Sequence, residues 1–222
     1  KRSKSLGDDV MHVMTFPHEF RDIQSCYPIY FKKDLETGSF YPIALFGLEE
    51  GQNLFLDDQD MWDATYIPLM SRRHPFLIAM QSSGDKSDDK KPVISIDMGN
   101  PRVNEIEGEL LFKDDGQPST YTKQIMKILE SIHLGNQSNS DFISEILELD
   151  LLESFTLEVT LSDGSKHALS GFYIIKETTL NNLKKDQLAS LQKKGYLLPI
   201  YMAVASHARM RSLVDKKDKR VG

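Results

Sequence analysis

The chain has 222 residues, of which 40% are hydrophobic and 27% are charged, and its formal net charge is −6. This length and composition predict a globular protein with a core of its own and exclude a disordered chain. The acidic balance opposes nucleic-acid binding, because phosphate neutralisation needs clustered Lys and Arg. No apolar run approaches the roughly 20 residues needed to span a bilayer, so we expect no membrane insertion and exclude a transmembrane permease or channel.

The single cysteine, Cys26, excludes an intramolecular disulfide and a zinc site built from several cysteines. The N-terminal residues lack the apolar core of a signal peptide. We therefore expect a cytoplasmic protein, and the alternative is a cell-surface protein exported by a route that needs no signal peptide.

The first strong pattern is a pair of β-prone runs, 28–32 and 40–46, which predicts a hairpin. Gly38 can adopt the positive φ that the turn requires, and Asp34 can accept hydrogen bonds from the backbone that follows it. A short strand is expected at 53–56. The segment 57–76 is predicted to be a loop with one helical turn.

The middle of the chain predicts two buried strands, 76–80 and 93–98, with an exposed polar loop at 82–91 between them. From Tyr121 to Ile132 the apolar residues follow a helical period. Gly135 interrupts this pattern, and Ser140 is a suitable N-cap for a second helix. We therefore expect two helices packed as a pair.

The alternation over 155–161 predicts a strand, and Asp163-Gly164 predicts a type I′ turn into a partner strand at 166–176. A helix at 186–194 should end at Gly195, and Pro199 fits the first turn of a last helix. This order predicts an α+β fold, a single compact domain with a mainly antiparallel sheet and packed helices. The expected organisation is an N-terminal tail at 1–20, a domain at 21–214 and a basic C-terminal tail at 215–222.

Several groups of residues resemble the bacterial SapC family. They are Phe40-Tyr41-Pro42-Ile43-Ala44-Leu45, Gly47-Leu48, Asn53-Leu54-Phe55, Trp62, Tyr66-Ile67-Pro68, Arg72-Arg73, Pro75-Phe76, Leu169-Ser170-Gly171-Phe172-Tyr173, Leu180-Asn181 and Gly195-Tyr196-Leu197. The resemblance covers about 27–213. It implies a surface-layer-associated protein with an accessory role in surface-layer or uptake systems and no established reaction. The chain departs from the family pattern at Ala203, where a histidine is expected one turn before Ser206.

The candidate ligand-binding residues are Arg72, Arg73 and His74, preceded by Trp62 and Tyr66. Arg can hold a carboxylate or phosphate with two parallel hydrogen bonds, so this segment predicts an anion pocket. The alternative is a structural ion pair between the loop and the core.

His207 lies on the apolar stripe of the last helix and is expected to face the interior, as a ligand-binding residue or as an ordinary core histidine. The acidic run from Asp57 to Asp63 lacks the glycine of a calcium-binding EF-hand loop. We therefore predict no metal site.

Nucleotide-binding glycine motifs and the G-x-S-x-G motif are absent, and we expect no cofactor. The favoured function is a non-enzymatic accessory or binding protein that recognises a protein partner or a small anionic ligand. The alternative is an enzyme of unknown reaction, with a pocket built from dispersed residues and with Arg72, Arg73 and His207 as the first residues to test. A self-associating surface-layer protein is a third reading, and the sequence leaves the oligomeric state open.

Overall fold

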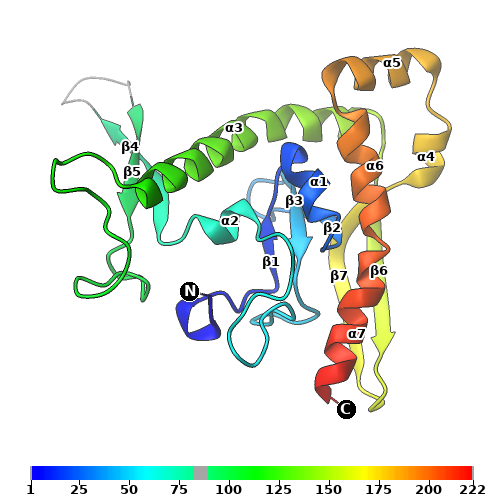
Figure 1. Ribbon diagram of the computed structural model, residues 1–222. Coiled ribbons are helices and arrows are strands. Elements are labelled where there is room, and N and C mark those ends of the chain that lie inside the picture. Colours follow the sequence, from blue (N-terminus) through cyan, green and yellow to red (C-terminus); the bar gives the residue numbers. More distant parts are fainter. Residues whose placement is uncertain (1, 83–89, 222) are drawn as a thin grey trace. The chain divides into compact units, whose positions relative to one another are not determined.

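The computed structural model describes residues 2–82 and 90–221 (Figure 1). Contacts within the chain divide it into two compact units. Unit 1 comprises Lys1–Pro68 and Gly135–Gly222, and unit 2 comprises Leu69–Leu134. The predicted α+β class with antiparallel sheets and packed helices is confirmed, and the expectation of one domain is refined by this division.

Unit 1 is built on a five-stranded sheet in which each strand is antiparallel to its neighbours. The strands lie in the order β1 (His12–Met14), β3 (Phe40–Leu45), β2 (Ile29–Lys33), β7 (Lys166–Ile175) and β6 (Leu152–Thr160). Both predicted hairpins are therefore confirmed. In the first, Asp34 Oδ1 accepts hydrogen bonds from the backbone N–H groups of Glu36 (2.9 Å) and Thr37 (2.8 Å), and Gly38 has a φ of 73°.

The turn between β6 and β7 differs from the expected type I′. That turn needs positive φ at two successive residues, whereas Gly164 (φ 83°) is the only turn residue here with positive φ. One left-handed residue is enough to return the chain because Asp163 Oδ1 also accepts a hydrogen bond from the Ser165 backbone at 2.9 Å.

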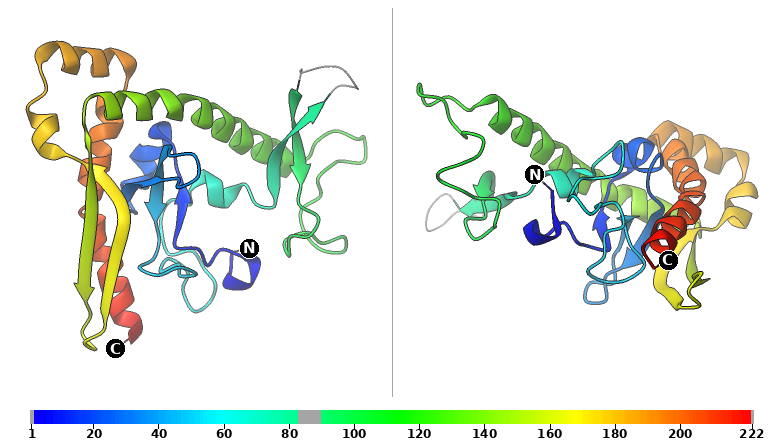
Figure 2. Two further views of the ribbon diagram at one scale, coloured as in Figure 1. Left: turned by 180° about the vertical axis from the view of Figure 1, so that it is seen from behind. Right: turned by 60° about the horizontal axis from the view of Figure 1, so that its bottom comes forward.

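Unit 1 also contains helices. They are η1 (Lys4–Leu6), η2 (Pro17–Glu19), α1 (Phe20–Ile23), α4 (Glu177–Asn181), α5 (Lys185–Lys194), α6 (Leu197–Ser206), α7 (Arg209–Val221) and the later part of α3 (Thr120–Glu148). Of these, α6 contacts strands β2 and β7. Figures 1 and 2 show α6 and α7 one after the other alongside the β6–β7 hairpin. The predicted helix end at Gly195 is confirmed, with a φ of 76°.

Both ends of the chain that were expected to be tails belong to the fold. Within the first 20 residues, β1 joins the sheet, and Phe16 and Phe20 are completely buried. At the other end, α7 continues to Val221, and Lys217 is buried in an ion pair with Glu49.

The two helices expected on either side of Gly135 form one continuous helix, α3, so the predicted break is wrong. Gly135 is buried, and a Cβ at this position would lie 2.6 Å from Cγ of Phe16 and 2.8 Å from Cε1 of His18. The glycine therefore allows close packing on the side of the helix and does not end it.

Unit 2 contains α2 (Leu69–Arg72), β4 (Phe76–Ser82), β5 (Lys90–Ile96) and the first part of α3. The predicted helical turn and both strands are confirmed, and the strands pair as an antiparallel hairpin. The predicted burial of these strands is wrong beyond Phe76, because Met80 is 56% exposed and Ile94 is 47% exposed. The polar loop expected at 82–91 lies largely outside the described residues.

The short strand predicted at 53–56 is absent from the described structure. Only Leu56 in this segment forms a β-bridge, with Trp62, and Asn53 instead donates its side-chain N–H to the Asp8 carbonyl at 2.9 Å. Among the described helices, none has the length and apolar character required to cross a membrane.

Candidate functional site

A cavity of about 290 Å³ in unit 1 is the candidate site. Its lining combines cationic and hydroxyl side chains with apolar ones. The lining residues are Pro17, His18, Arg21, Ser138, Lys194, Gly195, Tyr196, Leu198, Pro199 and Met202. They come from η2 with the adjoining α1, from α3 and from the corner between α5 and α6, so three separate segments of the sequence build one pocket.

The corner between α5 and α6 is fixed by its backbone. Gly195 ends α5 in the left-handed conformation, and its N–H bonds to the Gln192 carbonyl at 3.1 Å. The N–H of Tyr196 bonds to the Leu191 carbonyl at 2.9 Å, which completes a Schellman motif. Pro199 then fits within the first turn of α6, where a missing N–H costs no helical hydrogen bond. This geometry holds Lys194 and Leu198 beside the same cavity.

The opposite wall depends on the close approach at Gly135. The His18 ring stacks on the Phe16 ring with an interplanar angle of 2° and a centroid distance of 5.8 Å. On α3, Ser138 donates its hydroxyl to the Gly135 carbonyl at 3.1 Å. The position of His18 and that of Ser138 are thus both tied to the same turn of α3.

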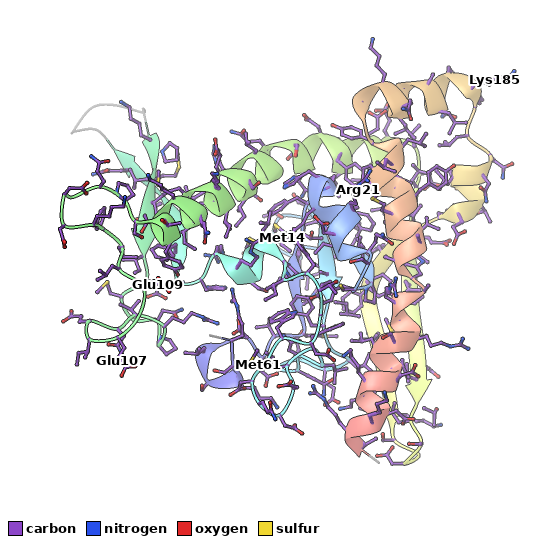
Figure 3. All side chains as sticks on the ribbon, in the orientation of Figure 1. Met14, Arg21, Met61, Glu107, Glu109 and Lys185 are labelled. Carbon is purple, nitrogen blue, oxygen red and sulfur yellow. The ribbon has the colours of Figure 1, made fainter. Side chains whose placement is uncertain are left out.

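Arg21 provides a positive charge that no protein group in the described structure neutralises. It lies on α1 (Figure 3), is exposed, and its guanidinium has no ion pair or hydrogen bond among residues 2–82 and 90–221. Lys194 is paired with the Glu145 carboxylate, and this hydrogen bond raises the pKa of Lys194. The cavity therefore has one cation available to a ligand and one that is already paired.

The other titratable groups of the cavity are neutral near pH 7. Burial lowers the pKa of His18, so its ring is uncharged and retains one acceptor and one donor nitrogen. Burial, together with the nearby Asp141 carboxylate, raises the pKa of Tyr196, which keeps its hydroxyl protonated. The site can therefore offer a guanidinium, the Tyr196 hydroxyl and a neutral imidazole beside an apolar wall.

Trp62 and Tyr66, two of the residues predicted from the sequence, meet at Tyr27 in unit 1. Trp62 Nε1 donates to the Tyr27 hydroxyl at 2.7 Å, and that hydroxyl donates to the Tyr66 carbonyl. The Tyr66 hydroxyl donates to the buried Glu19 carboxylate at 2.8 Å, and Thr15 donates to its second oxygen at the same distance. These bonds give both aromatic residues a structural role in fastening 57–68 to the core.

Arg72, Arg73 and His74 belong to unit 2. Arg72 is the exposed last residue of α2. Arg73 is half-buried and donates to the Phe76 carbonyl at 2.9 Å, and burial lowers its pKa. Its Nε is buried and has no hydrogen-bond partner among the described residues. None of the three lines the cavity in unit 1.

His207 ends α6 and faces the interior, as the apolar stripe predicts. Its ring lies 5.5 Å from the Tyr30 ring, and burial lowers its pKa, although Glu177 opposes that shift. Its Nε2 is buried without a hydrogen-bond partner in the described part of the chain. His207 does not line the cavity, so its predicted role in ligand binding stays a prediction.

Sequence reasoning missed Arg21, His18, Ser138 and Lys194, because they are dispersed over 177 positions of the chain, from residue 18 to residue 194, and form no local motif. One signal was available: Gly195-Tyr196-Leu197 is among the segments that resemble the SapC family, and two of these residues line the cavity. Within residues 2–82 and 90–221, no group of three or more His, Cys, Asp or Glu side chains is placed to hold a metal ion.

Comparison with known proteins identifies the family. The search of curated proteins and the search of solved structures gave no significant match. The family model of SapC matches residues 1–213, so the match also includes the first 26 residues, which the resemblance seen in the sequence left out. Because the match covers nearly the whole chain, this protein belongs to the SapC family.

Proposed function

We propose that this protein is a non-enzymatic binding protein that holds a small ligand with one anionic group and an apolar body in the cavity of unit 1. The observation that supports this proposal is the uncompensated guanidinium of Arg21 beside the apolar side chains of Leu198, Pro199 and Met202. Guanidinium groups bind carboxylate and phosphate with two parallel hydrogen bonds.

The size of the cavity limits the ligand. Small-molecule sites in proteins usually have volumes of about 300–1,000 Å³, so a cavity of about 290 Å³ is at the lower end of that range. A medium-chain or aromatic carboxylate fits this description better than a nucleotide or a peptide. The Tyr196 hydroxyl offers an additional donor, and the neutral His18 ring adds no net charge.

The test is isothermal titration calorimetry with butanoate, octanoate, 3-phenylpropanoate and inorganic phosphate, each compared with an uncharged analogue such as octanamide. We expect octanoate or 3-phenylpropanoate to bind and the amide to bind at least tenfold more weakly. Replacing Arg21 by Ala should weaken carboxylate binding by about ten- to a hundredfold, because a charge-assisted hydrogen bond contributes about 1.5–3 kcal/mol.

Arg211→Ala is the matched control, since Arg211 is also exposed in unit 1 but does not line the cavity. Its affinity should equal that of the parent protein. Failure of all four anions to bind, or equal binding by the Arg21→Ala and parent proteins, would refute an anion site at this position.

A further inference from the structure

The loop between β5 and α3 in unit 2 exposes large apolar side chains. Ile106 is 94% exposed, Leu110 is 76% exposed and Phe112 is 59% exposed. A single exposed apolar residue is ordinary on a protein surface, whereas three within seven residues form a patch of the kind that marks an interaction site. We name these three side chains the loop patch.

Local hydrogen bonds hold the patch in place. Asn104 Oδ1 accepts from the backbone N–H groups of Ile106 (2.7 Å) and Glu107 (3.0 Å). The Leu111 carbonyl accepts from the Ser119 N–H (3.0 Å) and from the Thr122 hydroxyl (2.6 Å), which ties the loop to the first turn of α3. A surface fixed in this way loses less conformational entropy when a partner binds.

Negative charges are interleaved with the apolar side chains. Glu105, Glu107 and Glu109 are exposed around Ile106, and the last two are labelled in Figure 3. Asp114 and Asp115 follow Phe112, and Lys113 is the only basic residue in 104–117. None of these carboxylates forms an ion pair in the described structure. Five carboxylates against one ammonium leave the loop with a local charge of −4.

We propose that the loop patch is a docking surface for a basic, amphipathic segment of a partner protein. The apolar side chains would pack against the apolar face of that segment, and the carboxylates would pair with its Lys and Arg side chains. The charge argues against the other classes of partner. Nucleic acid and anionic lipid would be repelled, and a second copy placed symmetrically would bring two loops of charge −4 together.

The probe for this proposal is a fluorescein-labelled amphipathic peptide of Leu and Lys, compared with a peptide in which every Lys is replaced by Glu. Fluorescence anisotropy should show that the Lys peptide binds the full chain and that the Glu peptide does not. Affinity should fall at least fivefold between 50 and 300 mM salt, because screening weakens exposed charge pairs.

Two variants separate the apolar and the charged contributions. Ile106→Ser with Phe112→Ser should weaken binding at least tenfold, and both residues are exposed enough that the fold should persist, which circular dichroism checks. The triple variant E105Q, E107Q and E109Q should weaken binding and reduce its salt dependence. Leu35→Ser is the control, because Leu35 is 95% exposed in the turn between β2 and β3 and should leave binding unchanged.

Four outcomes would overturn the proposal. Equal binding of the Glu peptide would mean that charge does not select the partner. Unchanged binding by the Ile106→Ser and Phe112→Ser protein, or no binding of the Lys peptide at all, would remove the patch as its docking surface. A dimer in sedimentation velocity that dissociates in this double variant would assign the patch to self-association.

Discussion

At Gly135, α3 packs tightly against the N-terminal segment of unit 1. A Cβ there would be 2.6 Å from Cγ of Phe16, which is far inside van der Waals contact. Phe16 is completely buried, so its ring cannot move aside without disturbing the core. A glycine in mid-helix is thus required by packing, although it lowers helix propensity.

We expect Gly135→Ala to lower the free energy of unfolding by about 1–3 kcal/mol, because overpacking a tight contact outweighs the better helix propensity of Ala. Urea denaturation measures this change. Ser140→Ala, at an exposed position of the same helix, is the control and should shift stability by no more than about 0.5 kcal/mol. A Gly135→Ala protein at least as stable as its parent would contradict the close-packing role.

The residues of the cavity show why a site of this kind is hard to predict from one sequence. Arg21 has no neighbour in the sequence that distinguishes it from any other exposed arginine, and Lys194 lies near the end of an ordinary basic helix. Arg21 and Lys194 line the same cavity only because η2, α1, α3 and the α5–α6 corner come together in the fold. Trp62 and Tyr66, in contrast, are easily noticed in the sequence, yet their hydrogen bonds join parts of the core.

At the scale of elements, predictions from the sequence are reliable where local chemistry determines the structure. Asp34, Gly38 and Gly164 act within their own turns, and both hairpins were correctly predicted. Predictions failed where a distant contact decides. Gly135 packs against Phe16, which is more than 100 residues away from it in the sequence, and the segment 53–56 is held by Asp8 and Asp9 instead of forming a strand.

The last helix, α7, is attached to unit 1 through charged side chains. Lys217 is buried and pairs with Glu49, and this hydrogen bond lowers the pKa of the Glu49 carboxyl. The Arg220 guanidinium donates to the carbonyls of Leu54 (3.0 Å) and Leu56. A run of basic residues at the end of the sequence therefore has a structural function in addition to any contribution to solubility.

Lys217→Ala should lower the free energy of unfolding by about 1 kcal/mol, through the lost packing of the lysine stem and the lost hydrogen bond. The effect is modest because Glu49 remains 48% exposed and water can solvate it after the substitution. Chemical denaturation of Lys219→Ala, an exposed lysine on the same helix, supplies the comparison and should show no measurable change. Equal stabilities for the two variants would mean that α7 is not held by Lys217.

At the scale of the whole molecule, composition and length correctly indicated a folded protein, and the order of the predicted elements indicated its α+β class, but neither could indicate that 69–134 forms a unit of its own. That division depends on which residues contact one another, and no change in composition marks its boundaries.

The pH dependence of stability is a second property of the whole molecule, and it depends on burial. His12, His18 and His207 lie in different parts of unit 1, and burial lowers the pKa of each.

These three histidines should make the protein less stable in mild acid. In the unfolded chain they titrate near pH 6.5, whereas in the folded protein they bind a proton only at lower pH, so the unfolded state takes up more protons as the pH falls. The contribution of the three neutral histidines to the free energy of unfolding is complete above pH 6.5 and is lost as the pH decreases below that value. Urea denaturation at pH 7.5 and pH 5.5 should therefore give a lower midpoint at pH 5.5.

His207→Phe should reduce the difference between the two midpoints, because a ring that cannot be protonated then lies beside Tyr30. Midpoints that are equal, or higher at pH 5.5, would show that these partly desolvated histidines do not control the response of this fold to acid.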